Sequence, residues 1–189
     1  MCQWVRIFLL TFFPTIDNIY LVKEMLLYPK LYLENVTKIT IDLLNKYNLK
    51  GIILDIDNTL IDYDKNLLDG IEEWNILMKE NDIQLYILSN TNKLEKVKKV
   101  ANILNIPFIN FAKKPSKKGF IKVKEIMKIP EENIAVVGDQ IMTDVLGGNR
   151  CKMFTILTKP IDKRDILITK VKRPLEKIII NKYLKSNIK

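Results

Sequence analysis

Two aspartates, Asp55 and Asp57, stand directly after a short apolar run, Gly51-Ile52-Ile53-Leu54, in the segment Asp55-Ile56-Asp57-Asn58-Thr59. On a chain that is leaving an extended strand, side chains two residues apart project to the same side. Paired carboxylates can supply a nucleophile and a general acid or base. The pair alone is weak support for such a site, because Asp, Asn and Thr are also common in loops and helix caps.

Three further polar segments follow apolar runs in the same way. Ser89-Asn90-Thr91 offers a hydroxyl and backbone N–H groups at the expected start of a helix, an arrangement that caps the helix and can also bind phosphate. Lys113-Lys114-Pro115 is either a solvated charge run or the source of a cation. Gly138-Asp139-Gln140-Ile141-Met142-Thr143-Asp144 is a second acidic cluster.

Five apolar runs predict the strands that carry these segments. They are apolar throughout instead of alternating, as a parallel sheet covered on both faces requires, and span 51–54, 84–88, 107–109, 134–137 and 153–157. Helical spacing predicts helices over 68–79, 92–104 and 116–127, the last with Ser116 as its N-cap. Gly147, Gly148 and Asn149 predict a helix stop.

The predicted fold is therefore α/β, a three-layer sandwich with a central parallel five-stranded sheet. Ligands of such sheets bind outside the carboxyl ends of the strands. The four polar segments are accordingly expected to meet at one edge of the sheet.

The residue types at this edge limit the chemistry. The chain has no histidine, which excludes histidine-based acid–base catalysis, Ser-His-Asp triads and imidazole metal sites. Clustered carboxylates from Asp55, Asp57, Asp139 and Asp144 would repel one another, so they need a cation. Oxygen ligands without His or Cys predict Mg²⁺.

Length and composition indicate one globular domain. The 189 residues, 48% apolar and 28% charged, suit a single well-buried domain and exclude a disordered chain. We predict a domain over 25–189 with a basic tail from about 160. The preceding extension, 1–24, is either mis-started or poorly ordered, or a membrane-touching anchor. Two cysteines without CxxC spacing form neither a disulfide framework nor a zinc site, which favours a reducing compartment.

Positive charge is concentrated at the C-terminal end. The net charge is +9, and residues 152–189 hold eleven Lys or Arg against three acids. This surplus suits an anionic partner, either a membrane surface or a nucleic acid. The tail lacks aromatic residues interleaved with its basic ones, so no nucleic acid is expected.

The last eighteen residues, 172–189, have the spacing of an amphipathic helix. This pattern predicts a helix packed on the core or a basic helix lying on an anionic membrane, and both can hold at once. The apolar residues near one face are Leu175, Ile178, Ile179, Tyr183 and Leu184.

The ordered set of motifs resembles the haloacid-dehalogenase superfamily, from about Met25 to the C-terminus. More narrowly, the sequence is similar to the YqeG-type phosphatases of subclass IIIA, whose mitochondrial and plastid relatives are phosphatidylglycerophosphate phosphatases. The segments that carry this resemblance are 50–60, 112–115, 138–140, 143–150 and 172–176. It implies a Rossmann-like core without a cap domain and a Mg²⁺-dependent phosphatase.

The resemblance also implies roles for the four aspartates. Asp55 would attack phosphorus and form an aspartyl-phosphate, and Asp57 would protonate the leaving alcohol and then activate water. Mg²⁺ would lie between the Asp55 carboxylate, the Asp57 backbone carbonyl and Asp139. Asp144 would orient the metal's waters.

The phosphoryl oxygens would be held, by the same resemblance, by Ser89, the Asn90 backbone and Lys114. Lys113 is less suited to this role, because the family pattern places the phosphate-binding lysine directly before the proline.

Spacing also bears on the substrate. Only 34 positions separate Asp55 from Ser89, and 25 separate Ser89 from Lys114, which leaves no room for a folded cap. An open site suits a bulky phosphate ester such as a lipid headgroup or a phosphoprotein. Together with the basic tail, the resemblance to lipid-phosphate phosphatases implies dephosphorylation of phosphatidylglycerophosphate to phosphatidylglycerol, by a cytoplasmic enzyme peripheral at the inner membrane face, as the leading expectation. The alternative is a soluble phosphatase for sugar phosphates, nucleotides or phosphoproteins.

Overall fold

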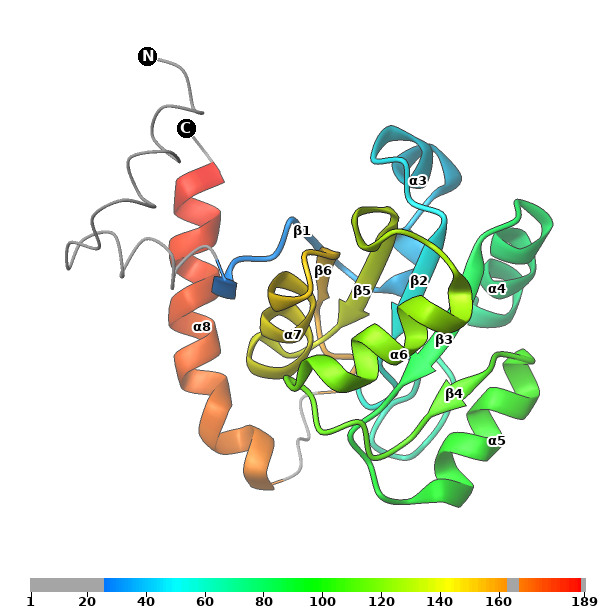
Figure 1. Ribbon diagram of the computed structural model, residues 1–189. Helices are drawn as coiled ribbons and strands as arrows, with labels where there is room; N and C mark the ends of the chain where they lie inside the picture. Colours follow the sequence, from blue (N-terminus) through cyan, green and yellow to red (C-terminus); the bar gives the residue numbers. More distant parts are fainter. Residues whose placement is uncertain (1–25, 163–166, 188–189) are drawn as a thin grey trace, which may run out of the picture.

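A parallel sheet forms the centre of the protein. The structure is a computed structural model, which describes residues 26–162 and 167–187. The strand order is β1-β6-β5-β2-β3-β4. Helices cover both faces of this sheet (Figure 1), which confirms the predicted three-layer α/β sandwich. The strands are β1 (Leu31–Leu33), β2 (Gly51–Leu54), β3 (Gln84–Leu88), β4 (Phe108–Ile109), β5 (Ile134–Gly138) and β6 (Phe154–Thr158).

The described sheet has six strands, so the prediction of five was wrong by one. The additional strand, β1, lies at the edge and pairs in parallel with β6, with Leu31 opposite Ile156 and Leu33 opposite Thr158. Its three residues are only half-buried. A short, half-buried edge strand lacks the uniform apolar run by which the central strands were identified. The other five strands agree with the predicted runs to within one residue at each end.

Alternate residues of the central strands face opposite layers, as the two-residue period of a strand requires. Ile52 and Leu54 of β2 belong to the core beneath α3 (Ile41–Lys46), α4 (Ile71–Glu80) and α5 (Leu94–Leu104). Ile53 belongs to the core beneath α6 (Lys117–Met127) on the other face. All four residues of β2 are buried, which is why this strand is apolar throughout.

The three helices predicted between the strands are present as α4, α5 and α6, and each begins one to three residues later than predicted. Ser116 is the N-cap of α6, where its Oγ accepts a hydrogen bond from the Lys118 N–H. The expected cap of α5 at Ser89-Asn90-Thr91 was wrong, because that helix begins at Leu94 after Lys93 as N-cap. Helix α3 was not predicted; Thr40 caps it through a 3.2 Å bond from the Leu43 N–H.

The helix stop predicted at Gly147-Gly148-Asn149 lies one residue before the observed end of the helix at Arg150. These residues lie inside α7 (Leu146–Arg150), which follows a π-helical turn, η3 (Ile141–Val145). The glycines are required for close packing: a Cβ on Gly148 would lie 2.6 Å from Thr155 Cγ2, and one on Gly147 would overlap the Phe120 ring. Small residues therefore allow α7 to approach both β6 and α6.

The C-terminal helix α8 (Leu167–Asn187) lies beside the β1 side of the sheet (Figure 1). Glu176 is buried and accepts a 3.2 Å hydrogen bond from the Met142 N–H. Buried Tyr183 donates a 3.4 Å hydrogen bond to the Lys30 carbonyl. The tail helix thus packs on the core, while Lys177, Ile178, Lys182, Leu184 and Lys185 are exposed.

None of the described helices combines the length and apolarity needed to cross a membrane. The expectations for the extension 1–24 concern residues outside the described part of the chain.

Replacing Gly148 by alanine should lower the free energy of unfolding by about 1–3 kcal/mol, because the added methyl overpacks the contact with Thr155. Urea denaturation measures this change. Gly119→Ala is the matched comparison, since its Cβ would meet the tip of the Leu88 side chain at 3.0 Å and the Ala112 Cβ at 3.4 Å, both longer than the 2.6 Å contact at Gly148. A Gly148→Ala protein as stable as Gly119→Ala would contradict the packing argument.

Candidate active site

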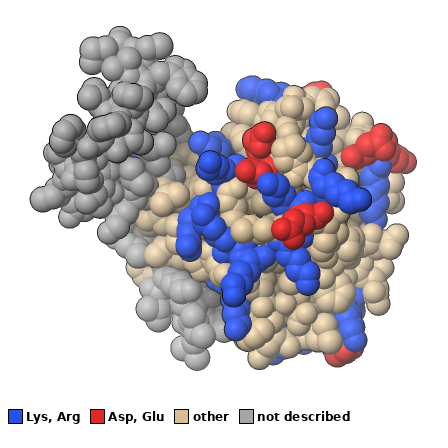
Figure 2. Space-filling view, in the orientation of Figure 1, with Lys and Arg blue, Asp and Glu red and all other residues tan. Residues whose placement is uncertain are grey.

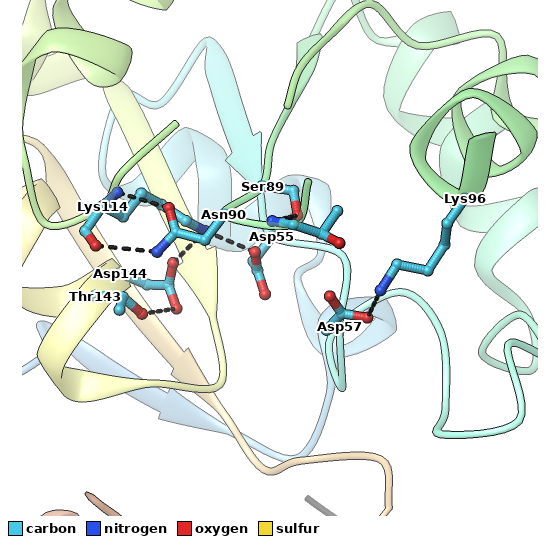
Figure 3. A network of polar contacts seen from close by, with 9 residues as sticks. Asp55, Asp57, Ser89, Asn90, Lys96, Lys114, Thr143 and Asp144 are labelled. Carbon is cyan, nitrogen blue, oxygen red and sulfur yellow. Dashed lines mark hydrogen bonds and ion pairs between the residues drawn. The ribbon is translucent and has the colours of Figure 1, made fainter. Parts of the chain in front are cut away.

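The polar segments meet at the carboxyl edge of the sheet, as predicted. The Asp55 N–H donates to the Val137 carbonyl at 2.9 Å, and the Ser89 N–H donates to the Ile109 carbonyl at 3.0 Å. Each bond extends the strand ladder by one residue, so the two side chains are held by the sheet itself. Figure 3 shows Ser89, Asp55, Lys114 and Asp144 gathered at this edge.

A buried lysine stands at the centre of the cluster. Lys114 Nζ lies 2.6 Å from Asp55 Oδ1 and 2.6 Å from Asp144 Oδ1, and its side chain is only 3% exposed. The side chain of Asn90 holds the lysine backbone: its Oδ1 accepts a 2.6 Å bond from the Lys114 N–H, and its Nδ2 donates to the Lys114 carbonyl at 3.0 Å. Lys113 does not join the cluster; its Nζ lies 5.0 Å from the centroid of the Phe111 ring.

Asp144, in η3, can extend into the cluster because the neighbouring strand β5 ends in a glycine, which has no side chain. A Cβ on Gly138, the last residue of β5, would overlap the Asp144 carboxyl group. Thr143 orients the same carboxylate by donating a 3.0 Å hydrogen bond to Asp144 Oδ2. Gly138 therefore serves the site by having no side chain.

Three carboxylates of the cluster are arranged as a metal site would require. Oxygen atoms of Asp55, Asp139 and Asp144 all lie within 4.8 Å of one another, and all three residues are buried. The single ammonium group of Lys114 does not neutralise three carboxylates. Oxygen donors of this kind fit a hard divalent cation. The side chain of Asp57 lies outside this group of three.

The pKa values reflect this burial. Loss of solvation raises the pKa of Asp55 to about 7; Lys114 opposes the rise, and the charges of Asp144 and Asp57 add to it. Burial alone would lower the pKa of Lys114, but Asp144 and Asp55 beside it raise it above its usual value, so the ammonium stays charged. A further cation at Asp55 would favour its ionised form.

Asp57 has a partner that sequence reasoning missed. Its Oδ1 forms an ion pair with Lys96 Nζ, and the two side chains are 32% and 13% exposed. Lys96 belongs to the first turn of α5, whose neighbouring lysines, Lys98 and Lys99, are exposed. A lysine in a Lys-rich amphipathic helix is normally solvated. The one feature of the sequence that could have pointed to Lys96 as a site residue is its position in the first turn of the helix that follows Ser89.

A parallel α/β sheet with carboxylates and a lysine at its carboxyl edge is the arrangement of a haloacid-dehalogenase-type phosphatase. Residues 16–162 match the family model described as "Mitochondrial PGP phosphatase". The chain belongs to this family and is a phosphatase. The match starts before Met25, where the sequence motifs placed the beginning of the resemblance.

A curated relative agrees with this assignment, and two solved structures share the fold. The chain is 41% identical over 154 residues to "Probable phosphatase YqeG" of Bacillus subtilis, covering 81% of this chain and 89% of the relative. A hydrolase from Streptococcus pneumoniae TIGR4 shares the fold with a TM-score of 0.51 at 13% identity, covering 68% of this chain and 99% of that one. An uncharacterised Listeria monocytogenes protein has a TM-score of 0.50 at 19% identity, covering 63% of this chain and 86% of that one.

Addition of Mg²⁺ should raise the melting temperature of the wild-type protein, because a ligand that binds only the folded state stabilises it, by about 1.4 kcal/mol at tenfold excess over Kd. Asp139→Asn should abolish the shift by removing one of the three buried carboxylates. Differential scanning fluorimetry with and without Mg²⁺ measures it. Asp69→Asn, an exposed acid outside the cluster, should keep the full shift. An unaltered shift in Asp139→Asn would exclude this cluster as the metal site.

Proposed function

We propose that this phosphatase is a Mg²⁺-dependent phosphomonoester hydrolase that acts on phosphatidylglycerophosphate through an aspartyl-phosphate on Asp55. The observation that carries the proposal is the placement of Asp55: a buried carboxylate at a strand end, with Lys114 Nζ 2.6 Å from one of its oxygens. A fixed carboxylate beside a fixed cation can attack a phosphoryl group whose oxygens the cation also contacts.

In the first step an Asp55 oxygen attacks phosphorus and the bond from phosphorus to the alcohol oxygen breaks. Asp57, two residues along the chain, donates a proton to the departing oxygen. In the second step Asp57 takes a proton from a water molecule, which attacks the phosphorus of the aspartyl-phosphate. Inorganic phosphate leaves and the Asp55 carboxylate is restored.

The remaining site residues would bind and orient the phosphoryl group. Ser89 Oγ, the Asn90 N–H and the Lys114 ammonium are proposed to contact its oxygens. Mg²⁺ held by Asp55, the Asp57 backbone carbonyl and Asp139, with Asp144 near its waters, would offset the repulsion between the anionic nucleophile and the anionic substrate.

The open edge of the sheet supports a large substrate. Between β2 and α4 the chain forms only a short flap, tied by single bridges from Ile61 to Asp57 and to Leu67. Between β3 and β4 it forms only α5. Neither connection is a folded cap, which supports a bulky phosphate ester as the substrate.

The charge distribution supports an anionic surface as the location of that substrate. Basic side chains gather on the face over α6 and α7 (Figure 2). The outer side of α8 adds Lys177, Lys182 and Lys185, all exposed, next to the exposed apolar residues Ile178 and Leu184. Each basic residue near an anionic membrane contributes about 1 kcal/mol to binding. The family description, with its reference to PGP, supports the same substrate.

Replacing Lys177, Lys182 and Lys185 by glutamine should lower turnover of phosphatidylglycerophosphate in anionic vesicles roughly tenfold or more, while hydrolysis of soluble 4-nitrophenyl phosphate is kept. Phosphate release measures both. The matched control is glutamine at the exposed residues Lys38, Lys50 and Lys99. Asp55→Asn should abolish both activities.

Equal loss on both substrates in the triple variant would show that these lysines support the structure instead of a membrane contact. Turnover of the soluble ester without any turnover of the lipid would overturn the lipid assignment in favour of a soluble phosphatase.

A further inference from the structure

Two lysines, from different elements, flank the aspartate pair on opposite sides. Figure 3 shows Lys114 on one side of Asp55 with Asp144, and Lys96 on the far side beyond Asp57. Lys96 comes from α5 and Lys114 from the loop before α6. The mechanism described above uses Lys114 and leaves Lys96 without a role.

The charged side chain of Lys96 is largely removed from solvent. Its side chain is 13% exposed, whereas Lys93, Lys98 and Lys99 on the same stretch of chain are exposed. Removing an ammonium group from water is unfavourable unless an anion compensates it. Among the described residues Asp57 is the one hydrogen-bond partner of Lys96 Nζ. An ammonium group has three N–H donors, so two remain for a ligand.

The mechanism places Lys96 on the side of the leaving group. In a displacement at phosphorus the nucleophile and the leaving oxygen lie roughly in line on opposite sides of the phosphorus atom. Asp55 is the nucleophile and Asp57 is the acid that reaches the leaving oxygen. Lys96, bonded to Asp57 and remote from Lys114, therefore faces the alcohol part of the substrate, while Lys114 faces the phosphoryl group.

We propose that Lys96 is a specificity-determining residue that recognises a second negative charge carried by the leaving alcohol. The substrate class is then a phosphomonoester whose alcohol bears a phosphodiester or similar anion a few bonds from the ester oxygen. This inference rests on the proposed function and deepens it by naming the residue that would recognise the anion of the leaving alcohol, since a neutral alcohol gives the two remaining donors of Lys96 nothing to bind.

Two soluble phosphomonoesters of propane-1,3-diol test the inference without a membrane. One carries a methyl phosphodiester on its second oxygen, and the other carries a neutral methyl ether there. The wild-type protein should favour the charged ester in kcat/KM by about tenfold, as expected for one charge-assisted hydrogen bond.

Lys96→Met should bring this ratio close to one, and Lys96→Arg should restore most of it, because arginine keeps the charge. Lys99→Met, an exposed lysine one turn along the same helix, should keep the wild-type ratio. The ratio of the two kcat/KM values is the readout, because a purely structural loss lowers both values alike and leaves it unchanged.

An unchanged ratio in Lys96→Met would overturn the inference and reduce Lys96 to a support for Asp57. A wild-type ratio near one would overturn it as well, and this measurement needs no variant. Wild-type protein that hydrolyses neither ester, nor 4-nitrophenyl phosphate, would instead contradict the proposed function itself.

Discussion

The ion pairs of Lys114 with Asp55 and Asp144 are the interaction on which the rest of the site depends. Three buried carboxylates at one strand edge would otherwise repel one another in surroundings that screen charge poorly. Lys114 offsets part of this repulsion at a distance of 2.6 Å from each of two oxygens. Removing one partner of a buried ion pair leaves an uncompensated charge, so the loop that carries Lys114 and the turn that carries Asp144 must be positioned together.

The surrounding fold meets this requirement with backbone and small residues. Asn90, from the end of the neighbouring strand, holds the Lys114 backbone by two hydrogen bonds. Gly138 leaves space for the Asp144 carboxyl group, and the glycines of α7 let that helix pack against α6 and β6. The absence of side chains at these glycines thereby sets how closely the elements on this side of the sheet approach one another.

Much of this arrangement could be predicted from the sequence, because the central strands are buried on both faces and the polar residues follow directly after them. The rest depends on contacts between distant segments. Strand β1 is short and half-buried, so its own residues do not identify it. Gly148 was interpreted as part of a helix stop. That its missing side chain also leaves room for Thr155 of β6 depends on the tertiary fold. Lys96 could not be assigned to Asp57, because the two lie 39 positions apart and only the tertiary fold joins them.

Detection of a covalent phosphoryl group on Asp55 tests the central claim most directly. 4-Nitrophenyl phosphate has a leaving group that needs no proton, so an Asp57→Asn variant should complete the first step and be slowed in the second, which requires a base. After acid quenching, peptide mass spectrometry should find one phosphoryl group on the peptide that contains Asp55. A burst of nitrophenol with Asp55 unmodified, or with the phosphoryl group on another residue, would contradict the account.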